Sequence, residues 1–474
     1  MNRPHRMAAV VGIVVLLVAA WVVDNRVDRP STEVATDVQA PMGGRPGARS
    51  SAWFCTGATS TTDGSANGTV VVANAGNRRL AGSVTVVPSE GEPKQVALSV
   101  AASGRTVVRL LDVVTAPYVS ALVELDGGEA VVELSASGPL GESATACASS
   151  ASTTWYFAEG VTTRDAAEVI TLFNPFPEDA IVDLVFTTEE GEVTPQALTG
   201  LSVRGRGMQA VNVGDHVQRR VQVSAQIMAR AGRLVASRLQ TFDGSDGRKG
   251  MSVGLGSAAP GDLWYFPEGF LGEGLTERFQ LFNPGREEAR TSLDLSLEQG
   301  QAEPIILTVP AQSRVTLNAN EEARIPKGVA HAVTVRSTND VPVVVERTTD
   351  AVAPAPRLGL AITAGARLAT ERWVVAAGQA DDSTEEWLVI QNPGDRSLRV
   401  TVTLLDEGVA VVPPGLGGVD VGARSRRGIR LNDTVRKGPT SLLVTAPGPI
   451  VVERDAYKGR NLGTIMSPAI PLRD

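Results

Sequence analysis

Histidine and aromatic residues are scarce in this chain of 474 residues. The only histidines are His5, His216 and His331, and aromatic residues make up 4% of the sequence. Histidine is the commonest general base and a frequent metal ligand, so its scarcity argues against most acid–base and metal chemistry. Neither His216 nor His331 has a second type of ligand beside it at metal-binding spacing. We therefore expect no metal, no cofactor and no catalytic residue, and we predict that the protein is not an enzyme.

The sequence also lacks the short motifs of common binding sites. It contains no Gly-x-x-x-x-Gly-Lys-Ser/Thr phosphate loop and no Gly-x-Ser-x-Gly nucleophile elbow. Residues 243–247, Asp-Gly-Ser-Asp-Gly, have some features of a calcium loop but lack its closing glutamate, which favours a polar hairpin turn. The formal charge of -8, without a basic stripe, predicts no nucleic-acid partner.

Cysteine occurs only twice, at Cys55 and Cys147. An exported chain meets an oxidising compartment, where a lone pair of cysteines in one domain is expected to form a disulfide. The bridge would close a long loop, which the chain-entropy model values at up to about 4–5 kcal/mol. Two unpaired thiols are the alternative, and a redox-active pair would be expected as Cys-x-x-Cys.

A long apolar run occurs at the N-terminus, from Met7 to Val23, preceded by Arg3 and Arg6. As a helix it would rise about 25 Å, near the lower limit for spanning a bilayer. The positive flank predicts that the rest of the chain lies outside the cytoplasm. We expect residues 1–23 to form a cytoplasmic stub and a transmembrane signal anchor that contacts the lipid bilayer. The alternative is a cleaved signal peptide, which would leave the protein secreted.

The sequence after the apolar run is rich in residues that form turns. Residues 24–50 contain three prolines and no long apolar run, which predicts a flexible linker. The whole chain has 48 glycines and 28 prolines, which favours short strands and turns over long helices.

Self-similarity at a fixed spacing is the main signal beyond residue 50. Segments 155–160 and 264–269 read Trp-Tyr-Phe-x-Glu-Gly, and weaker copies begin at Trp53 and Trp373. The four tryptophans are 102, 109 and 109 residues apart. An asparagine, a turn glycine and a late strand follow each tryptophan in the same order. The landmarks are Trp53, Trp155, Trp264 and Trp373; Asn74, Asn174, Asn283 and Asn392; Gly91, Gly191, Gly300 and Gly408; and Glu133, Ser237, Glu346 and Glu453.

The apolar residues between these landmarks predict strands. Leu293, Leu295 and Leu297 are spaced by two, which places them on one face of a strand. A hairpin at 446–448, Ala-Pro-Gly, is expected to lead into the late strand. Roughly seven strands in about 105 residues match an antiparallel β-sandwich of immunoglobulin or fibronectin type, whereas a propeller blade is shorter.

The predicted fold class is therefore all-β, a tandem array of four immunoglobulin- or fibronectin-like sandwich repeats after an N-terminal transmembrane helix. The repeats are expected at residues 51–150, 151–260, 261–369 and 370–474. A stiff rod and a compact array are both compatible with the short joins between them.

The repeat resembles one found in uncharacterised, exported or membrane-anchored actinobacterial proteins, a domain of unknown function. The resemblance rests on the Trp-Tyr-Phe-x-Glu-Gly start, the Asn-Pro-Gly turn and the Val-Glu-Arg late strand. It covers about residues 51–474, and copies two and three carry it best. It implies export, a cell-envelope setting among envelope-glycan genes, and no known activity.

The shared tryptophans could form a ligand platform or a buried scaffold. Sugar-stacking modules need exposed aromatic faces, and the chain has few aromatic residues. We therefore predict that the tryptophans and the four asparagines are scaffold residues. Glu159 and Glu268 would then bond backbone donors or face solvent, because a catalytic carboxylate pair would need both residues within one repeat.

These patterns predict a non-catalytic, membrane-tethered, extracytoplasmic protein that acts as a structural or binding module in the cell envelope. The expected partner is an envelope protein or glycan. An accessory subunit of an envelope-glycan assembly glycosyltransferase is the alternative. An envelope hydrolase is a third hypothesis, and it would require polar residues that converge where the repeats differ.

Overall fold

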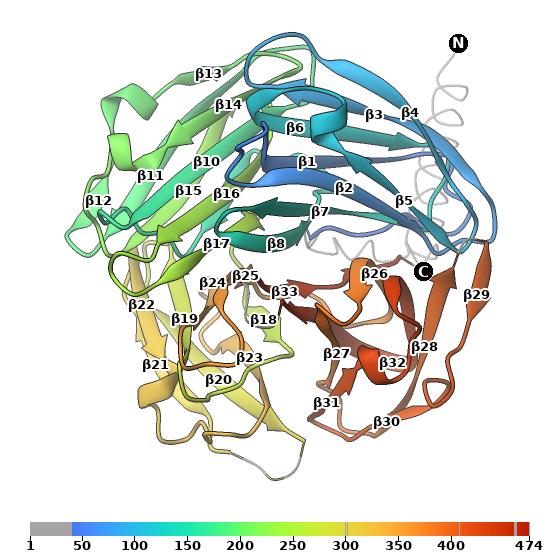
Figure 1. Ribbon diagram of the computed structural model, residues 1–474. Coiled ribbons are helices and arrows are strands. Elements are labelled where there is room, and N and C mark those ends of the chain that lie inside the picture. The colour runs from blue at the N-terminus through green and yellow to red at the C-terminus, as the bar shows by residue number, and fades with distance from the viewer. Residues whose placement is uncertain (1–39, 299, 301, 407, 459–461, 474) are drawn as a thin grey trace, which may run out of the picture. The chain divides into compact units, whose positions relative to one another are not determined.

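The predicted all-β class is confirmed. A computed structural model describes residues 40–298, 300, 302–406, 408–458 and 462–473, and it has 60% strand and 4% helical content. Its sheets are built mainly of antiparallel pairs (Figure 1). The predicted anchor and residues 24–39 of the predicted linker lie outside the described residues. Within the described part, no helix is long and apolar enough to cross a membrane.

Strands follow one another in a recurring order through the first two repeats. Repeat 1 contains β1 (Ser51–Ser60), β2 (Asn67–Asn74), β3 (Leu80–Pro88), β4 (Lys94–Val100), β5 (Gly104–Arg109), the 3-10 helix η1 (Leu110–Asp112), β6 (Ala116–Leu125), β7 (Ala130–Gly138) and β8 (Gly141–Ala146). Repeat 2 contains β9 (Thr154–Phe157), β10 (Ala166–Asn174), β11 (Ala180–Thr188), β12 (Gly191–Val193), η2 (Gln196–Leu198), β13 (Leu201–Val203), β14 (Gly207–Asn212), η3 (Val213–Asp215), β15 (Val223–Ala231), β16 (Val235–Asp243) and β17 (Lys249–Leu255).

The same order continues in the second half of the chain. Repeat 3 contains β18 (Leu263–Phe266), β19 (Leu275–Asn283), β20 (Ala289–Leu297), β21 (Ile305–Val309), β22 (Ser313–Asn318), η4 (Ala319–Glu321), β23 (His331–Ser337), β24 (Val344–Ala351) and β25 (Gly359–Ala364). Repeat 4 contains β26 (Thr370–Ala380), β27 (Glu385–Asn392), β28 (Leu398–Asp406), β29 (Val409–Val411), β30 (Val419–Val421), β31 (Ser425–Arg430), η5 (Leu431–Asp433), β32 (Gly438–Tyr457), β33 (Thr464–Pro468) and β34 (Ile470–Pro471).

Each repeat has two sets of paired strands, which we call the Trp sheet and the Asn sheet after the landmark each contains. In repeat 3 the Trp sheet has the order β18-β23-β20-β21 and the Asn sheet β22-β19-β24-β25. Repeat 2 has the same pairings, with orders β12-β11-β15-β9 and β14-β10-β16-β17. Alternation along β11 places Val182, Leu184 and Phe186 in the core, while Asp183 and Val185 between them are partly exposed.

The chain crosses from the Trp sheet to the Asn sheet just before each late strand, so the hairpin expected at 446–448 is wrong. Strand β32 runs through these residues, pairs with β26 as far as Ile450, and pairs with β27 from Val451. In repeat 3 the corresponding strands, β23 and β24, belong to different sheets. A Pro-Gly pair signals a local turn, but it does not determine whether the flanking strands pair with each other.

A buried asparagine holds the two sheets together in every repeat. Asn283 accepts a hydrogen bond from the Gly285 N–H (2.9 Å) and donates to the carbonyl of Glu287 (2.7 Å), which fixes the turn after β19. It also donates to the Val309 carbonyl on the Trp sheet (3.1 Å). Asn74, Asn174 and Asn392 make the corresponding bonds. Because a buried amide is costly unless bonded, this side chain suits one turn geometry only.

The four tryptophans lie at corresponding places, on β1, β9, β18 and β26, and are 1–2% exposed. Three indole N–H groups donate to backbone carbonyls, from Trp155 to Leu234 (2.8 Å), Trp264 to Val343 (3.0 Å) and Trp373 to Ile450 (2.8 Å). The indole nitrogen of Trp53 has no hydrogen-bond partner among the described residues. Each indole therefore fills the space between the two sheets of its repeat.

The first repeat is also closed covalently. Cys55 on β1 and Cys147 after β8 form the predicted disulfide, with their Cα atoms 4.6 Å apart. Both cysteines are buried in the same apolar core as Trp53. The bridge joins the strand that opens the repeat to the segment that ends it.

Residues 40–50 correct the predicted linker, because part of this segment packs against the folded repeats. Gly43 is buried and forms a β-bridge with Leu472 at the opposite end of the chain. The Met42 N–H also donates to the Ser149 hydroxyl (3.1 Å). A composition rich in proline and glycine indicates irregular backbone, which can still be ordered by contacts elsewhere in the chain.

The repeats contact one another in a closed cycle. They therefore form the compact array and not the stiff rod. The last strands of the Asn sheets, β8, β17, β25 and β33, each contact the next, and β33 contacts β8. We call these the inner strands. Side-chain hydroxyls link them, since Ser143 accepts from the Val253 N–H (2.9 Å) and Ser252 from the Ile362 N–H (3.0 Å). The edge that each inner strand forms in its Asn sheet is thereby covered by neighbouring repeats.

Replacing Asn283 with alanine should destabilise the protein by about 2–4 kcal/mol, because the Glu287 and Val309 carbonyls and the Gly285 N–H lose their bonds to this buried side chain. Thermal unfolding followed by circular dichroism measures the effect. Asn212→Ala is the matched control, because the Asn212 side chain is exposed and donates to the exposed carboxylate of Asp215. Equal unfolding temperatures for the two variants would contradict this role for Asn283.

Candidate functional site

Buried charges are concentrated where one repeat meets the next. Between repeats 2 and 3, the guanidinium of Arg238 forms two bonds with the Glu346 carboxylate (2.8 and 3.1 Å). A second pair, Arg314 and Glu159, lies beside the first at 2.9 Å. All four side chains are at most 5% exposed. The Glu159 N–H also donates to Glu346 (2.6 Å), so both sides of the interface satisfy each other's charges.

The interface between repeats 3 and 4 repeats this arrangement. Arg347 pairs with Glu453, and Arg426 pairs with Glu268. The Glu268 N–H donates to Glu453 (3.2 Å), and the Arg347 guanidinium donates to the Glu268 carbonyl. The expectation that Glu159 and Glu268 would bond backbone donors or face solvent is therefore wrong. Each is buried against an arginine of the following repeat.

Repeats 4 and 1 meet through a reduced version of the same contact. The Glu133 carboxylate accepts from the N–H groups of Ala376 (3.2 Å) and Ala377 (3.1 Å). Ala377 stands where Glu159 and Glu268 stand in repeats 2 and 3, and its carbonyl accepts from Arg454. Arg105 donates to the Gly378 carbonyl (3.0 Å). This interface therefore keeps both arginines, Arg105 and Arg454, and the late-strand glutamate Glu133. The carboxylate that the other interfaces have at the position of Ala377 is absent.

The interface between repeats 1 and 2 has lost all of these charges. Leu134 stands at the Arg238 position and Ser237 at the Glu346 position, as the strand register shows. Gly57 and Met208 stand at the positions of Glu159 and Arg314. Hydroxyls bond here instead, with Thr56 2.7 Å from Ser120 and 3.0 Å from Thr171 in the next repeat. Because removing one member of a buried pair leaves an uncompensated charge, the loss of whole pairs preserves the interface.

A further buried glutamate lies beside the arginine in repeats 2, 3 and 4. Glu277 bonds His331 (2.9 Å) and Glu386 bonds Thr440 (3.1 Å). In repeat 2, Val223 stands at the position of His331, and neither carboxylate oxygen of Glu168 has a hydrogen-bond partner among the described residues. Burial raises the pKa of Glu168 to about 8, although nearby Arg238 partly offsets the effect.

His331 is the histidine that the structure places in the network. Burial alone would lower its pKa, but the adjacent Glu277 carboxylate raises it above the usual value. His216 is half-buried on a connecting segment, and His5 lies outside the described residues. Residues 243–247 form the predicted polar turn between β16 and β17. Among the described residues, no group of three or more His, Cys, Asp or Glu side chains could hold a metal ion.

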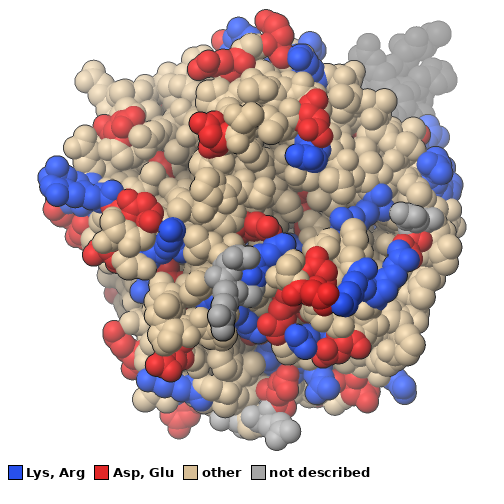
Figure 2. Space-filling view, in the orientation of Figure 1, with Lys and Arg blue, Asp and Glu red and all other residues tan. Residues whose placement is uncertain are grey.

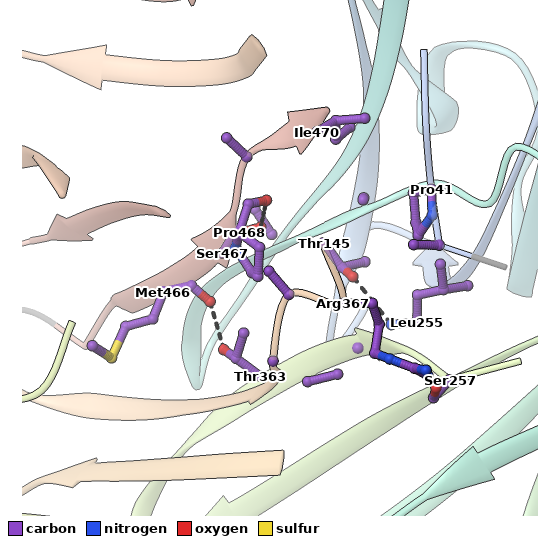
Figure 3. A pocket seen from close by; sticks show the side chains of 18 of the residues that line it. Pro41, Thr145, Leu255, Ser257, Thr363, Arg367, Met466, Ser467, Pro468 and Ile470 are labelled. Atoms are coloured by element: carbon purple, nitrogen blue, oxygen red, sulfur yellow. Dashed lines mark hydrogen bonds between the residues drawn. The ribbon is translucent and has the colours of Figure 1, made fainter. Parts of the chain in front are cut away.

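The inner strands line a partly open pocket with a cavity volume of about 110 Å³ (Figure 3). Every repeat contributes to its wall. The lining is mainly apolar, and Arg367 is its charged side chain among the described residues. We call this the inner-strand pocket; its lining includes Pro41, Thr145, Leu255, Trp264, Ile362, Trp373 and Ile470.

The charges on the surface are mixed in sign. Figure 2 shows acidic and basic groups interspersed across the visible face, without a continuous basic stripe there. The pairing positions inside the protein were missed by sequence reasoning, although the repeated Glu-Arg pair within an apolar late strand was the available signal. A charged pair in an otherwise buried strand indicates a partner across an interface.

Replacing Arg347 with leucine should destabilise the protein by about 3–5 kcal/mol, because it leaves Glu453 buried and unpaired. The double variant Arg347→Leu with Glu453→Ser copies the natural Leu134 and Ser237 pair. The double variant should recover most of the stability that Arg347→Leu loses. Urea unfolding of both single variants and the double variant measures the coupling. Additive effects of the two substitutions would contradict the paired role.

Glu168 should make stability depend on pH. The folded state keeps its proton up to about pH 8, whereas the unfolded carboxyl loses it near 4.5, so unfolding releases a proton between these values. The free energy of unfolding therefore falls as pH rises through this window. Glu168→Gln should match the wild type near pH 5 and exceed its unfolding temperature above pH 7. The exposed Glu287→Gln serves as control. Parallel pH profiles for wild type and Glu168→Gln would contradict the assignment.

Residues 124–352 match a family of unknown function (DUF5719). The matched part begins in β6 of repeat 1 and ends just after β24 of repeat 3. The actinobacterial origin stays a prediction. The comparison with curated proteins gives no match.

Several solved structures are similar to parts or most of the chain, at low TM-scores. The crystal structure of Thermotoga maritima 1070 is 21% identical, covers 23% of this chain and 94% of its own, and has a TM-score of 0.21. The Anabaena sensory rhodopsin transducer is 26% identical, with coverages of 19% and 84% and a TM-score of 0.18. A tetra-tandem repeat from the extending region of a large adhesion protein is 14% identical, with coverages of 90% and 99% and a TM-score of 0.11. These TM-scores are too low to transfer a function, and residues 124–352 resemble a family whose activity is unknown.

Proposed function

We propose that this chain is a non-catalytic, extracytoplasmic β-repeat protein that acts as a structural or binding module of the cell envelope. Its four repeats would be immunoglobulin-like sandwiches, and its N-terminal apolar run would tether it to the membrane. In this proposal the repeats form one rigid body that presents binding surfaces to an envelope protein or glycan.

The use of the buried charges carries this proposal. Arg238 and Arg347 pair with glutamates of the next repeat and are at most 1% exposed. In a catalytic centre, such groups would converge on a space that admits substrate. Here they bond each other across interfaces and hold neighbouring repeats in one arrangement. This use of buried charges is the one expected of a scaffold.

The disulfide supports the extracytoplasmic part of the proposal. Cys55 and Cys147 are the chain's only cysteines, and they are bonded. Disulfides persist in exported proteins and are rare in the cytosol. A bridge that closes a long loop in the first repeat suits a protein that must stay folded outside the cell.

The full chain, produced in an actinobacterium, should react with a membrane-impermeant lysine reagent in intact cells. Its cysteines should resist alkylation until a reductant is added, because they are bonded. Purified protein should sediment with isolated envelopes while releasing no reducing sugar from them. The measurements are mass spectrometry of the labelled lysines and cysteines, a sedimentation assay and a reducing-end assay.

A version without residues 1–39 is the control, and it should remain unlabelled inside the cell. Labelling that requires cell lysis would refute export, and release of reducing ends would refute a non-catalytic role. The protein can also be cross-linked in intact envelopes and then purified. Recovery of a stoichiometric glycosyltransferase with it would favour the accessory-subunit alternative over an independent module.

A further inference from the structure

The inner-strand pocket is a product of the closed cycle. Residues from all four repeats line it, most of them from the inner strands and the segments after them, so the cavity requires all four repeats together. Its cavity volume of about 110 Å³ leaves room for several water molecules or for a small organic group. Leu255, Ile362 and Ile470 from three repeats make its surface apolar. An apolar cavity with few polar groups is the usual form of a small-molecule site.

Arg367 breaks the repeat pattern inside this pocket. It follows Ala366, which bridges to Tyr265 on the tryptophan strand of repeat 3. The corresponding bridges and pairs in the other repeats place Ser149, Ala258 and Pro471 at its position. The other three repeats fold with a small or uncharged residue there. The architecture of the repeat therefore does not require an arginine at this position.

The charge of Arg367 is only partly compensated within the protein. One guanidinium nitrogen, Nη1, donates to the Ala259 carbonyl (2.8 Å), and the group lies 4.5 Å from the Trp264 ring centre. Its Nε is buried without a hydrogen-bond partner, and no described carboxylate forms an ion pair with it. Burial lowers the pKa of Arg367, an effect that Asp262 partly offsets. The arginines at the interfaces, by contrast, pair directly with glutamates.

We propose that the inner-strand pocket binds a small organic acid with an apolar body, whose carboxylate pairs with Arg367. The inference rests on the proposed binding role and specifies its ligand class. The carboxylate supplies the missing counter-charge, and the alkyl or aryl body displaces water from the apolar walls. Figure 3 shows Arg367 among the lining side chains, with its guanidinium toward Ser257.

Isothermal titration calorimetry of the full chain with octanoate, octanol and acetate tests the contributions of the carboxylate and of the apolar body separately. Octanol keeps the apolar body without the charge, and acetate keeps the charge without the body. Octanoate should bind at least 10-fold more tightly than either. Arg367→Gln should weaken octanoate at least 10-fold and leave octanol unchanged, whereas the exposed Arg290→Gln should change neither.

A second variant separates binding from folding. Ala364 lines the pocket and is partly exposed, so Ala364→Phe should fill the cavity and abolish octanoate binding while Arg367 stays in place. Equal affinity for octanoate and octanol, or octanoate affinity unchanged in Arg367→Gln or in Ala364→Phe, would overturn the proposal. If Arg367→Gln fails to fold, Ala364→Phe alone decides. The envelope location is tested separately, so failure here leaves the proposed scaffold role standing.

Discussion

A buried arginine on one repeat and a buried glutamate on the next make each repeat depend on its neighbour. Neither charge can be left in the interior alone, because the cost of removing it from water is several kcal/mol. Arg347 satisfies this constraint by reaching Glu453 and the Glu268 carbonyl, and Glu453 in turn receives the Glu268 N–H. The backbone of one repeat is thereby fixed against the side chains of the next. Such a contact gives orientation as well as attraction, since charge pairs have a narrow range of good geometries.

The repetition of this contact explains how the chain closes on itself. Similar repeats that meet through the same interface turn by a similar amount at each join, and here the fourth returns to the first. Glu133 then accepts the backbone N–H groups of Ala376 and Ala377, so the closing interface uses the same elements as the others. The bridge from Gly43 to Leu472 adds a contact between the two ends of the folded part. In a solenoid the end repeats lack a neighbour, whereas closure gives every repeat two.

Sequence reasoning reached the parts of the structure that recur locally. The tryptophans, asparagines and alternating apolar residues were visible because each copy repeats the same spacing, and the disulfide followed from there being two cysteines. The partners between repeats were harder to predict, because Arg238 and Glu346 are 108 residues apart: a charged pair within an apolar strand indicates that a partner exists but not which residue it is. The Ala-Pro-Gly segment failed for a related reason: a turn signal describes a few residues, while the choice between hairpin and crossover depends on which sheet the next strand joins.

The departures from the repeat carry different information from the repeat itself. Leu134 and Ser237 differ from the charged pairs elsewhere, yet they change together and keep their interface compatible. Gly57, which has no Cβ, allows the close approach of Ser237 and Val253 from repeat 2. Val223 and Arg367 depart from the repeat without such compensation, because the first leaves Glu168 with no hydrogen-bond partner and the second has no paired carboxylate among the described residues. A compensated change preserves the scaffold and needs no function to explain it. An uncompensated one costs stability, so it persists where something other than folding retains it. In a protein built by repetition, Arg367 and its apolar surroundings are therefore a stronger indication of binding than the conspicuous Trp-Tyr-Phe motif, whose tryptophans fill the cores of the repeats.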